Sequence, residues 1–288
     1  MGADREPLAE ADRISADWLS LREAADAAAR ESTRAAVAAL VAEAAPRTVV
    51  DVGCGTGAGG RWLLPLLEGD ERWILLDHDS ELLASTAHRL AERGARGPVE
   101  TRQADVGDLD EVLASAGPGT LTIASALLDL LTPAQIRRLL EAVGRHQVPL
   151  LVALTVTGGM DPSPRHPDDE LVSSAFNRHQ QRGGRCGPRA AEVLLSAADD
   201  LRLPTQTWET PWQLGPQDTA LLGQLVRDRA EVAEEQLTAE QDGDAVARVR
   251  RWREERLAQR AHGTLHLEIG HLDVLVGRAG LEPATKRL

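Results

Sequence analysis

The residues Thr48-Val-Val-Asp-Val-Gly-Cys-Gly-Thr-Gly57 decide the fold of this chain. The first half, Thr48–Val52, is rich in β-branched side chains and predicts a short strand. Three alternate glycines follow; they permit a tight turn with positive φ and bring bare backbone amides close to a ligand. A helix is predicted next, over Gly59–Leu67, and its N-terminus adds a partial positive charge to the loop. The segment therefore indicates a ligand-binding strand–loop–helix unit.

The chain around this unit alternates between predicted strands and helices. Ile14–Ala45 is Ala-rich and predicts a helix with room for one break. Further strands are predicted over Trp73–Leu76, Pro98–Gln103, Leu121–Ala126 and Pro149–Val156, and helices over Ser80–Glu92 and Thr132–His146. Five strands that alternate with helices predict right-handed βαβ units and an open, doubly wound α/β sheet.

The last 130 or so residues follow a different pattern. Residues 158–188 are rich in Gly, Pro and Arg and predict an insertion at one end of the sheet, with a short helix inside it. The expected later elements are helices over Pro188–Asp199, Pro216–Thr238 and Asp244–His262, and strands over Thr205–Thr210 and Thr264–Val276. We predict an N-terminal helical cap over residues 1–46 and one elaborated domain over 47–288.

Composition narrows the class of protein. The chain has 288 residues and a formal net charge of -13, which argues against a nucleic-acid partner because phosphate affinity needs clustered Lys and Arg. No apolar stretch reaches the roughly 20 residues of a membrane helix, so no membrane partner is expected. Two cysteines, Cys54 and Cys186, fit a reducing cytoplasm. We expect a cytoplasmic protein with a small-molecule substrate, and a homodimer remains open.

Two ligands compete for the glycine loop. Gly53-x-Gly55-x-x-Ala58, with Asp77 about 20 residues further on, fits the dinucleotide fingerprint of a nicotinamide-dependent oxidoreductase. However, Asp51 would place a carboxylate beside a pyrophosphate, whereas a cationic ligand would suit it. A non-catalytic protein that keeps a cofactor fold as a binding module is a third alternative.

The loop resembles motif I of class I S-adenosylmethionine-dependent methyltransferases, which reads acid-x-Gly-x-Gly-x-Gly, and the likeness extends over about residues 48–157. It implies a Rossmann-like, seven-stranded sheet with an antiparallel last strand, and S-adenosylmethionine as the cofactor. The residues that would hold the methionine part are Asp51, Gly53, Cys54, Gly55 and Gly57, with the acid facing the amino group.

The resemblance also implies residues for the rest of the cofactor. Asp77 would accept hydrogen bonds from both ribose hydroxyls, and His78 stands where the family usually has an apolar residue beside the adenine. Asp105 would bond the adenine amine, the Val106 amide would bond a ring nitrogen, and Ser125 would face the reactive side. The Asn-Pro-Pro-Tyr type of motif, found in members that methylate bases and glutamine, is absent. Its absence favours a small-molecule acceptor, methylated at oxygen or nitrogen.

Methyl transfer from a sulfonium is an in-line displacement that needs a base only when the nucleophile carries a proton of high pKa. Asp129, after the fourth strand, is the first candidate, and His179 in the insertion is the second. Asn177 and Gln180 would contact the acceptor. The histidine spacing suggests no metal site. Arg22 and Arg30 on the first helix could pair the cofactor carboxylate, a role that first-helix residues play in similar enzymes.

Overall fold

The computed structural model describes residues 15–277. Its eight strands form one sheet in the order β3-β2-β1-β4-β5-β8-β6, and β7 pairs with β8 beside this path. The strands are β1 (Thr48–Val52), β2 (Arg72–Asp77), β3 (Val99–Gln103), β4 (Thr120–Ser125), β5 (Leu150–Ser163), β6 (Thr205–Glu209), β7 (Trp212–Leu214) and β8 (His266–Val276). The α-helices are α1 (Ala16–Ala29), α2 (Arg34–Ala44), α3 (Ala58–Leu63), α4 (Ser80–Glu92), α5 (Leu109–Ala116), α6 (Pro133–His146), α7 (Asp169–Gln180), α8 (Ala190–Asp200), α9 (Thr219–Ala239) and α10 (Gly243–Ala261).

The sheet confirms the predicted Rossmann-like α/β class. β1 lies parallel between β2 and β4, β3 pairs in parallel with β2, and β5 does so with β4. β8 runs antiparallel to β5 and β6, so the predicted antiparallel last strand is present. The additional strand β7 was not predicted. It spans only three residues, which is too short for an alternation pattern to be recognised.

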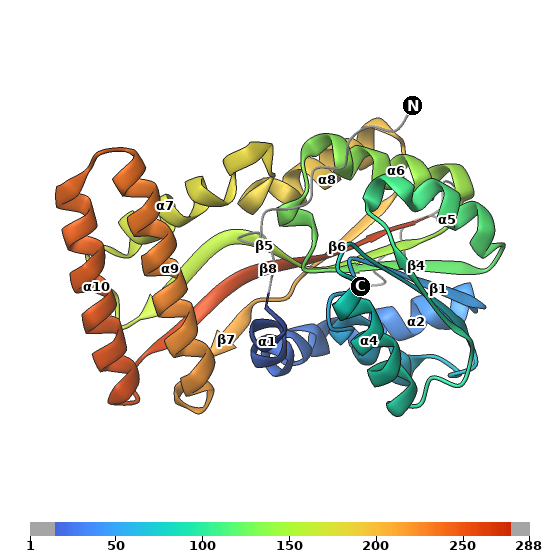
Figure 1. Cartoon of the computed structure of the whole chain (residues 1–288), viewed down its shortest axis with the longest axis horizontal. Helices are drawn as coiled ribbons and strands as arrows, with labels where there is room; N and C mark the ends of the chain where they lie inside the picture. Colours follow the sequence, from blue (N-terminus) through green and yellow to red (C-terminus); the bar gives the residue numbers. More distant parts are fainter. Residues whose placement is uncertain (1–14, 278–288) are drawn as a thin grey trace, which may run out of the picture.

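Helices cover both faces of the parallel strands (Figure 1). α5, α6 and α8 pack on one face, where Leu109 and Leu139 meet Val50 of β1. α2, α3 and α4 pack on the other face, where Leu63 meets Val49. All five residues of β1 are buried, as expected for a parallel strand that is covered on both faces.

The N-terminal helix breaks once, at a 3₁₀ turn over Arg30–Thr33. The two halves join different cores. α2 packs Val37 against the parallel sheet, whereas α1 packs Trp18 and Leu21 against side chains of β7, β8 and α9. Residues 1–14 of the proposed cap lie outside the described residues, and a division of the chain at residue 46 stays a prediction.

β5 is much longer than expected. We predicted its end at Val156 and an insertion from residue 158, but the strand continues to Ser163, which pairs with His266 of β8. Two register shifts, between Val152 and Thr155 and between Val156 and Met160, absorb the glycines in this stretch. The pairing with β8 therefore extends the strand past a point where local composition predicts a loop.

α7, α9 and α10 surround the outer halves of β5 and β8, and we call this part the helical lobe (Figure 1). Its core includes Val172, Val226, Val249, Trp252 and Ile269. Among residues 15–277, no helix combines the length and the apolar character that crossing a membrane requires.

Candidate functional site

A cavity of about 820 Å³ lies over the carboxyl ends of β1, β2, β3 and β4, where ligands of doubly wound sheets bind. Its lining comes from α1 (Leu19, Arg22 and Asp26), from residues 51–56 with Ala58 and Gly59, from 76–79 with Leu82, from 103–106, from 125–127, and from Leu130, Leu131, Gln135 and Arg185. Most of the residues predicted to hold a cofactor thus lie around one cavity.

The glycine loop has the strained backbone that its sequence predicts. Gly53, Gly55 and Gly57 adopt φ of 64°, 53° and 81°. A Cβ on Gly53 would lie 2.7 Å from Leu127 Cδ1, so the loop also needs the small residue for close packing. Gly57 does not line the cavity; it forms the turn into α3. Its role in cofactor binding stays a prediction. In the structure it is the N-cap residue of α3, and its positive φ sets the direction in which the helix leaves the loop.

Asp77, the last residue of β2, holds the glycine loop through a hydrogen bond to its backbone. Its side chain is buried, with Oδ2 accepting a hydrogen bond from the Gly55 amide at 2.8 Å and Oδ1 accepting one from the Asp79 amide at 3.0 Å. Nδ1 of the half-exposed His78 lies 3.3 Å from the same Oδ1. Because a carboxylate offers about four acceptor positions, Asp77 keeps capacity for a ligand while it holds the loop.

Asp51 is the most unusual group in the cavity wall. It is 1 % exposed, and its Oδ2 has no hydrogen-bond partner among the described residues. Burial, together with the nearby charge of Asp77, raises the pKa of Asp51 to about 7, although Arg30 and Arg61 partly offset this. An unpartnered buried carboxyl is costly, and a cation in the cavity would supply the missing partner.

Asp105 and Val106 lie at the far end of the cavity, after β3. The exposed carboxyl of Asp105 caps the 3₁₀ turn Val106–Asp108 by accepting a hydrogen bond from the Gly107 amide. The Asp105 amide in turn donates a hydrogen bond to Oδ2 of Asp108 at 3.1 Å. The turn explains why an acid stands here, and both Asp105 and Val106 face the cavity.

Cys54 and Ser125 complete the predicted wall. Cys54 is buried within the glycine loop, and burial raises the pKa of its thiol well above the usual range, so it stays a neutral thiol. Ser125 ends β4 and also borders a smaller neighbouring pocket.

The acceptor-side candidates on α7 lie away from this cavity. His179 pairs with Glu235 of α9 at 3.2 Å, and Nδ2 of Asn177 donates to the Gly158 carbonyl at 3.0 Å. Neither these two nor Gln180 lines the cavity. α7 packs against α9 and β5, and the catalytic role of His179 and the substrate contacts of Asn177 and Gln180 stay predictions. From the whole predicted insertion, only Arg185 reaches the cavity.

Asp129, the first candidate for a catalytic base, lies next to the cavity but not in its wall. Its neighbours Leu127, Leu130 and Leu131 line the cavity, but Asp129 itself does not. Burial raises the pKa of its carboxyl to about 6, and a backbone hydrogen bond and the charges of Arg22 and Arg185 oppose the shift. It therefore titrates near neutral pH behind the wall rather than on it.

An ion pair on α1, between Arg22 and Asp26, forms part of the cavity wall. Arg22 was named from the sequence, but Asp26 was not. Arg22 binds Asp26 through two hydrogen bonds of 3.0 and 3.2 Å. Asp26 also accepts a hydrogen bond from Trp212 Nε1 at 3.1 Å, and burial raises its pKa. Arg30, predicted to act with Arg22, lies in the smaller pocket instead. Gln135 had no sequence signal, because nothing local indicates that the start of α6 faces a ligand.

One comparison with known protein families matches the part of the chain that contains β1 to β4. Residues 49–149, from β1 to the residue before β5, match the family model described as a methyltransferase domain. No curated protein matches the chain significantly.

Several solved structures are distantly similar. The YcgJ protein of Bacillus subtilis is 14 % identical, over 86 % of this chain and 100 % of that one, with a TM-score of 0.47. A putative sarcosine dimethylglycine methyltransferase of Galdieria sulphuraria is 13 % identical, over 84 % and 85 %, with 0.42. A geranyl diphosphate C-methyltransferase of Streptomyces coelicolor, solved with S-adenosyl-L-homocysteine, is 13 % identical, over 81 % and 72 %, with 0.41.

Residues 49–149 therefore match a methyltransferase domain, and they lie in a sheet of Rossmann-like topology. S-adenosylmethionine is the cofactor that the sequence resemblance implies. This match favours the methyltransferase interpretation of the glycine loop over that of a nicotinamide-dependent oxidoreductase.

The cavity fits this cofactor on independent structural grounds. The orphaned Oδ2 of Asp51 offers a partner for a cationic amino group. At Gly53 a Cβ would collide with Leu127, so only glycine lets the loop backbone approach this part of the cavity wall so closely. Asp77 and Asp105 stand at the ends of neighbouring strands, which spaces hydrogen-bond acceptors along an elongated polar ligand.

Proposed function

We propose that this chain moves a methyl group from S-adenosylmethionine to an oxygen or nitrogen atom of a small metabolite by in-line displacement. The observation that carries the proposal is the unpartnered, buried Asp51 carboxyl in the wall of a cavity beside a glycine loop. Together with the family match, it supports a cationic cofactor in that position.

The cofactor supplies a methyl group already activated on a sulfonium centre, so the protein's task is mainly binding and alignment. We assign Asp51 and the loop of Gly53, Cys54 and Gly55 to the methionine part. Asp77 is assigned to the ribose, and His78, Asp105 and Val106 are assigned to the adenine. Ser125, at the end of β4, is placed on the side of the reacting centre.

The rest of the cavity wall supports a small acceptor. Leu127, Leu130 and Leu131 form an apolar surface, and Arg22, Gln135 and Arg185 add hydrogen-bond donors around it. Ligand sites for small molecules combine these features: apolar walls with a few placed polar groups. We therefore propose an acceptor with an apolar body and at least one hydrogen-bond acceptor or negative charge.

Asp129 is proposed as a positioning residue. It stands behind the wall, and its charge acts on Arg22 and Arg185, both of which line the cavity. A carboxyl that titrates near pH 6 can therefore change how these two guanidinium groups are held. The proposal does not require a general base in direct contact with the acceptor.

The first experiment is calorimetric titration of the full-length protein with S-adenosylmethionine, S-adenosylhomocysteine, NADH and NADPH. Micromolar binding of the two sulfur compounds alone supports the cofactor assignment. Binding of a nicotinamide without either of them would overturn it. If folded protein binds none of the four, a non-catalytic role takes the place of the enzyme.

The second experiment uses S-adenosylmethionine with a labelled methyl group and a panel of small metabolites that carry hydroxyl, carboxyl or amine groups. NMR of the labelled product identifies the atom that received the methyl group. A product methylated at oxygen or nitrogen supports the proposal, whereas one methylated at carbon would contradict its finer part.

A further inference from the structure

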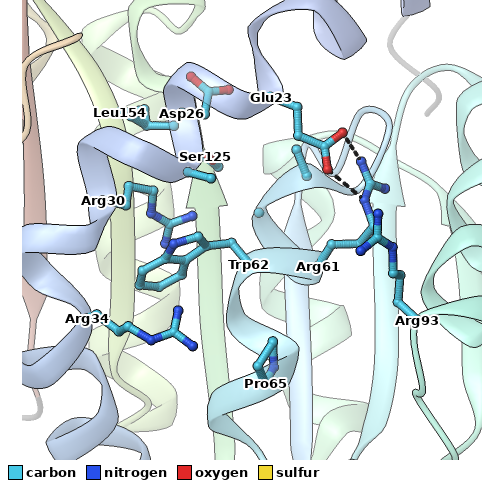
Figure 2. A pocket seen from close by; sticks show the side chains of 13 residues that line it. Glu23, Asp26, Arg30, Arg34, Arg61, Trp62, Pro65, Arg93, Ser125 and Leu154 are labelled. Atoms are coloured by element: carbon cyan, nitrogen blue, oxygen red, sulfur yellow. Dashed lines mark hydrogen bonds and ion pairs between the residues drawn. The ribbon is translucent and has the colours of Figure 1, made fainter. Parts of the chain in front are cut away.

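A smaller pocket of about 250 Å³ adjoins the main cavity on the outer side of α3 (Figure 2). The N-terminal helices supply Arg30 and Arg34 on one side, and α3 supplies Arg61 and Trp62 on the other. The pocket and the main cavity share Asp26, Ala58, Gly59 and Ser125 in their walls. The two spaces differ in their arginines, because Arg22 lines only the main cavity and Arg30 lines only this pocket.

The indole of Trp62 forms one wall of the pocket. The guanidinium of Arg30 stacks over it, with Cζ 3.8 Å from the ring centroid. Arg30 is only 4 % exposed, and its Nε has no hydrogen-bond partner among the described residues. The Nε1–H of Trp62 is also buried and also has no acceptor. Two buried N–H donors without partners therefore occur in one small pocket, an arrangement that is rare in folded proteins.

The carboxylates around the pocket are already engaged. Glu23 binds Arg61 through hydrogen bonds of 2.9 and 2.6 Å (Figure 2), and Asp26 binds Arg22. Asp273 forms a buried ion pair with Arg30, with Oδ2 3.7 Å from Nε, a distance too long for a hydrogen bond, and this Oδ2 also has no hydrogen-bond partner among the described residues.

Three arginines consequently keep donors for a ligand. Arg34 lies 3.8 Å from Glu31 without a hydrogen bond. Arg93 also lines the pocket, and its side chain has no hydrogen-bond or ion-pair partner among residues 15–277. Arg30 is the third. Burial lowers the pKa of Arg30, but Asp273 and Asp26 oppose this shift, and a guanidinium stays charged at neutral pH. The pocket thus presents an excess of positive charge and of N–H groups.

We propose that this pocket binds an oxyanion, a phosphate or carboxylate group of a small ligand other than the cofactor, through Arg30, Arg34 and the Trp62 Nε1–H. Planar guanidinium groups suit such anions because they donate parallel hydrogen bonds to two oxygens. The oxyanion is either a free ion or the charged end of an organic molecule, and both sources present the same oxygens to these donors.

The test is calorimetric titration with inorganic phosphate, phenyl phosphate and acetate at 0.15 M chloride, on the order of physiological ionic strength, with and without S-adenosylhomocysteine. Three variants are compared with the unchanged protein. Arg34→Gln removes a partly exposed charge, Trp62→Phe keeps a ring and removes its N–H, and Arg137→Gln removes an exposed arginine of α6 far from the pocket as a matched control.

We expect phosphate or acetate to bind with a Kd of about 1 mM or below. Arg34→Gln should weaken binding about tenfold, Trp62→Phe should weaken it severalfold, and Arg137→Gln should leave it unchanged. Stronger binding of phenyl phosphate than of phosphate points to an organic ligand, and equal binding points to a free ion. Either result supports the proposal.

Three results would overturn it. These are no binding of any oxyanion, equal losses in Arg34→Gln and Arg137→Gln, or a large loss of S-adenosylhomocysteine affinity in Arg34→Gln without oxyanion, which would give the pocket to the cofactor carboxylate. The titration with S-adenosylhomocysteine alone tests the proposed function separately, so failure of one idea does not count against the other.

Discussion

Asp77 Oδ2 accepts a hydrogen bond from the backbone amide of Gly55 at 2.8 Å. The acid at the end of β2 thus fixes the loop that follows β1, and the proposed ribose contact and the loop conformation depend on one carboxylate. This double role makes Asp77 less tolerant of substitution than a residue that only touches a ligand.

Asp77→Asn is expected to lower both stability and cofactor affinity. The amide can place an NH2 group against the Gly55 or Asp79 amide, and an unsatisfied buried donor costs about 1–3 kcal/mol. Thermal unfolding and S-adenosylhomocysteine titration measure the two effects. Asp79→Asn is the control, because asparagine also caps helices, and it should leave both quantities close to their original values. Loss of affinity with unchanged stability would mean that Asp77 does not hold the loop.

Asp51→Asn should change how stability depends on pH. The pKa of Asp51 rises from its unperturbed 3.8 to about 7 in the folded protein, so between these values the folded state binds more protons than the unfolded chain. The contribution of the Asp51 carboxyl to the free energy of unfolding is therefore largest below about pH 4. It decreases as the pH rises through about 7, by up to about 4 kcal/mol.

The variant removes this dependence. Without ligand, Asp51→Asn should be more stable than the original protein at pH 8, while its affinity for S-adenosylmethionine falls, because the cationic amino group loses its partner. Urea unfolding from pH 5 to pH 8, compared as a difference between the two proteins, cancels the contributions of other buried acids. A difference that does not vary with pH would contradict the raised pKa.

Gly57→Ala should disturb the glycine loop through one identifiable collision. Its Cβ would lie 2.6 Å from Thr86 Cγ2, and the hydroxyl of Thr86 donates to the Gly55 carbonyl at 2.6 Å. The double variant Gly57→Ala/Thr86→Ser removes the colliding methyl group and keeps the hydroxyl, so it should recover part of the lost affinity for S-adenosylhomocysteine.

Gly94→Ala separates collision from backbone strain. Gly94 has φ of 108° with no atom near its Cβ position, so its substitution introduces strain alone. We expect a stability loss of roughly 1 kcal/mol and unchanged ligand binding. If the double variant binds no better than Gly57→Ala, strain at Gly57 rather than contact with Thr86 is the cause.

Asp129→Asn should change the pH profile of kcat and His179→Gln should not, although the sequence makes both residues candidate catalytic groups. Once an acceptor is identified, Asp129→Asn should alter the limb of the kcat profile near pH 6, because that carboxyl titrates there. His179→Gln should leave the profile and the cofactor affinity unchanged, since its imidazole lies outside the cavity and pairs with an exposed glutamate of α9. A pH limb unaffected by Asp129→Asn would remove the positioning role.

The sequence contained enough local information to predict the cofactor half of the protein. The glycine loop, the N-cap at Asp79 and the capping box at Thr132 each depend on residues within a few positions. The same holds for the buried strands, whose apolar runs are continuous because both faces are covered. Most of these strands were predicted to within two residues or so, but β5 ends at Ser163 rather than at the predicted Val156, and α5 was not predicted.

The acceptor side could not be predicted in this way, because its features depend on contacts between distant residues. The extension of β5 to Ser163 exists because β8, more than 100 residues later, pairs with it. His179 was singled out for its polar neighbours, yet its partner, Glu235, belongs to another helix. Arg185 and Gln135 meet in one cavity wall only after the sheet has formed.

The β5–β8 ladder has a consequence for cooperativity. The two strands remain paired from Leu150 with Val276 to Ser163 with His266, and this length runs from the cofactor-binding sheet into the helical lobe. The lobe cannot swing away from the cavity without breaking hydrogen bonds inside the sheet itself. We therefore expect the lobe and the methyltransferase domain to melt together in one calorimetric transition, and the acceptor wall to be as rigid as the sheet that carries it.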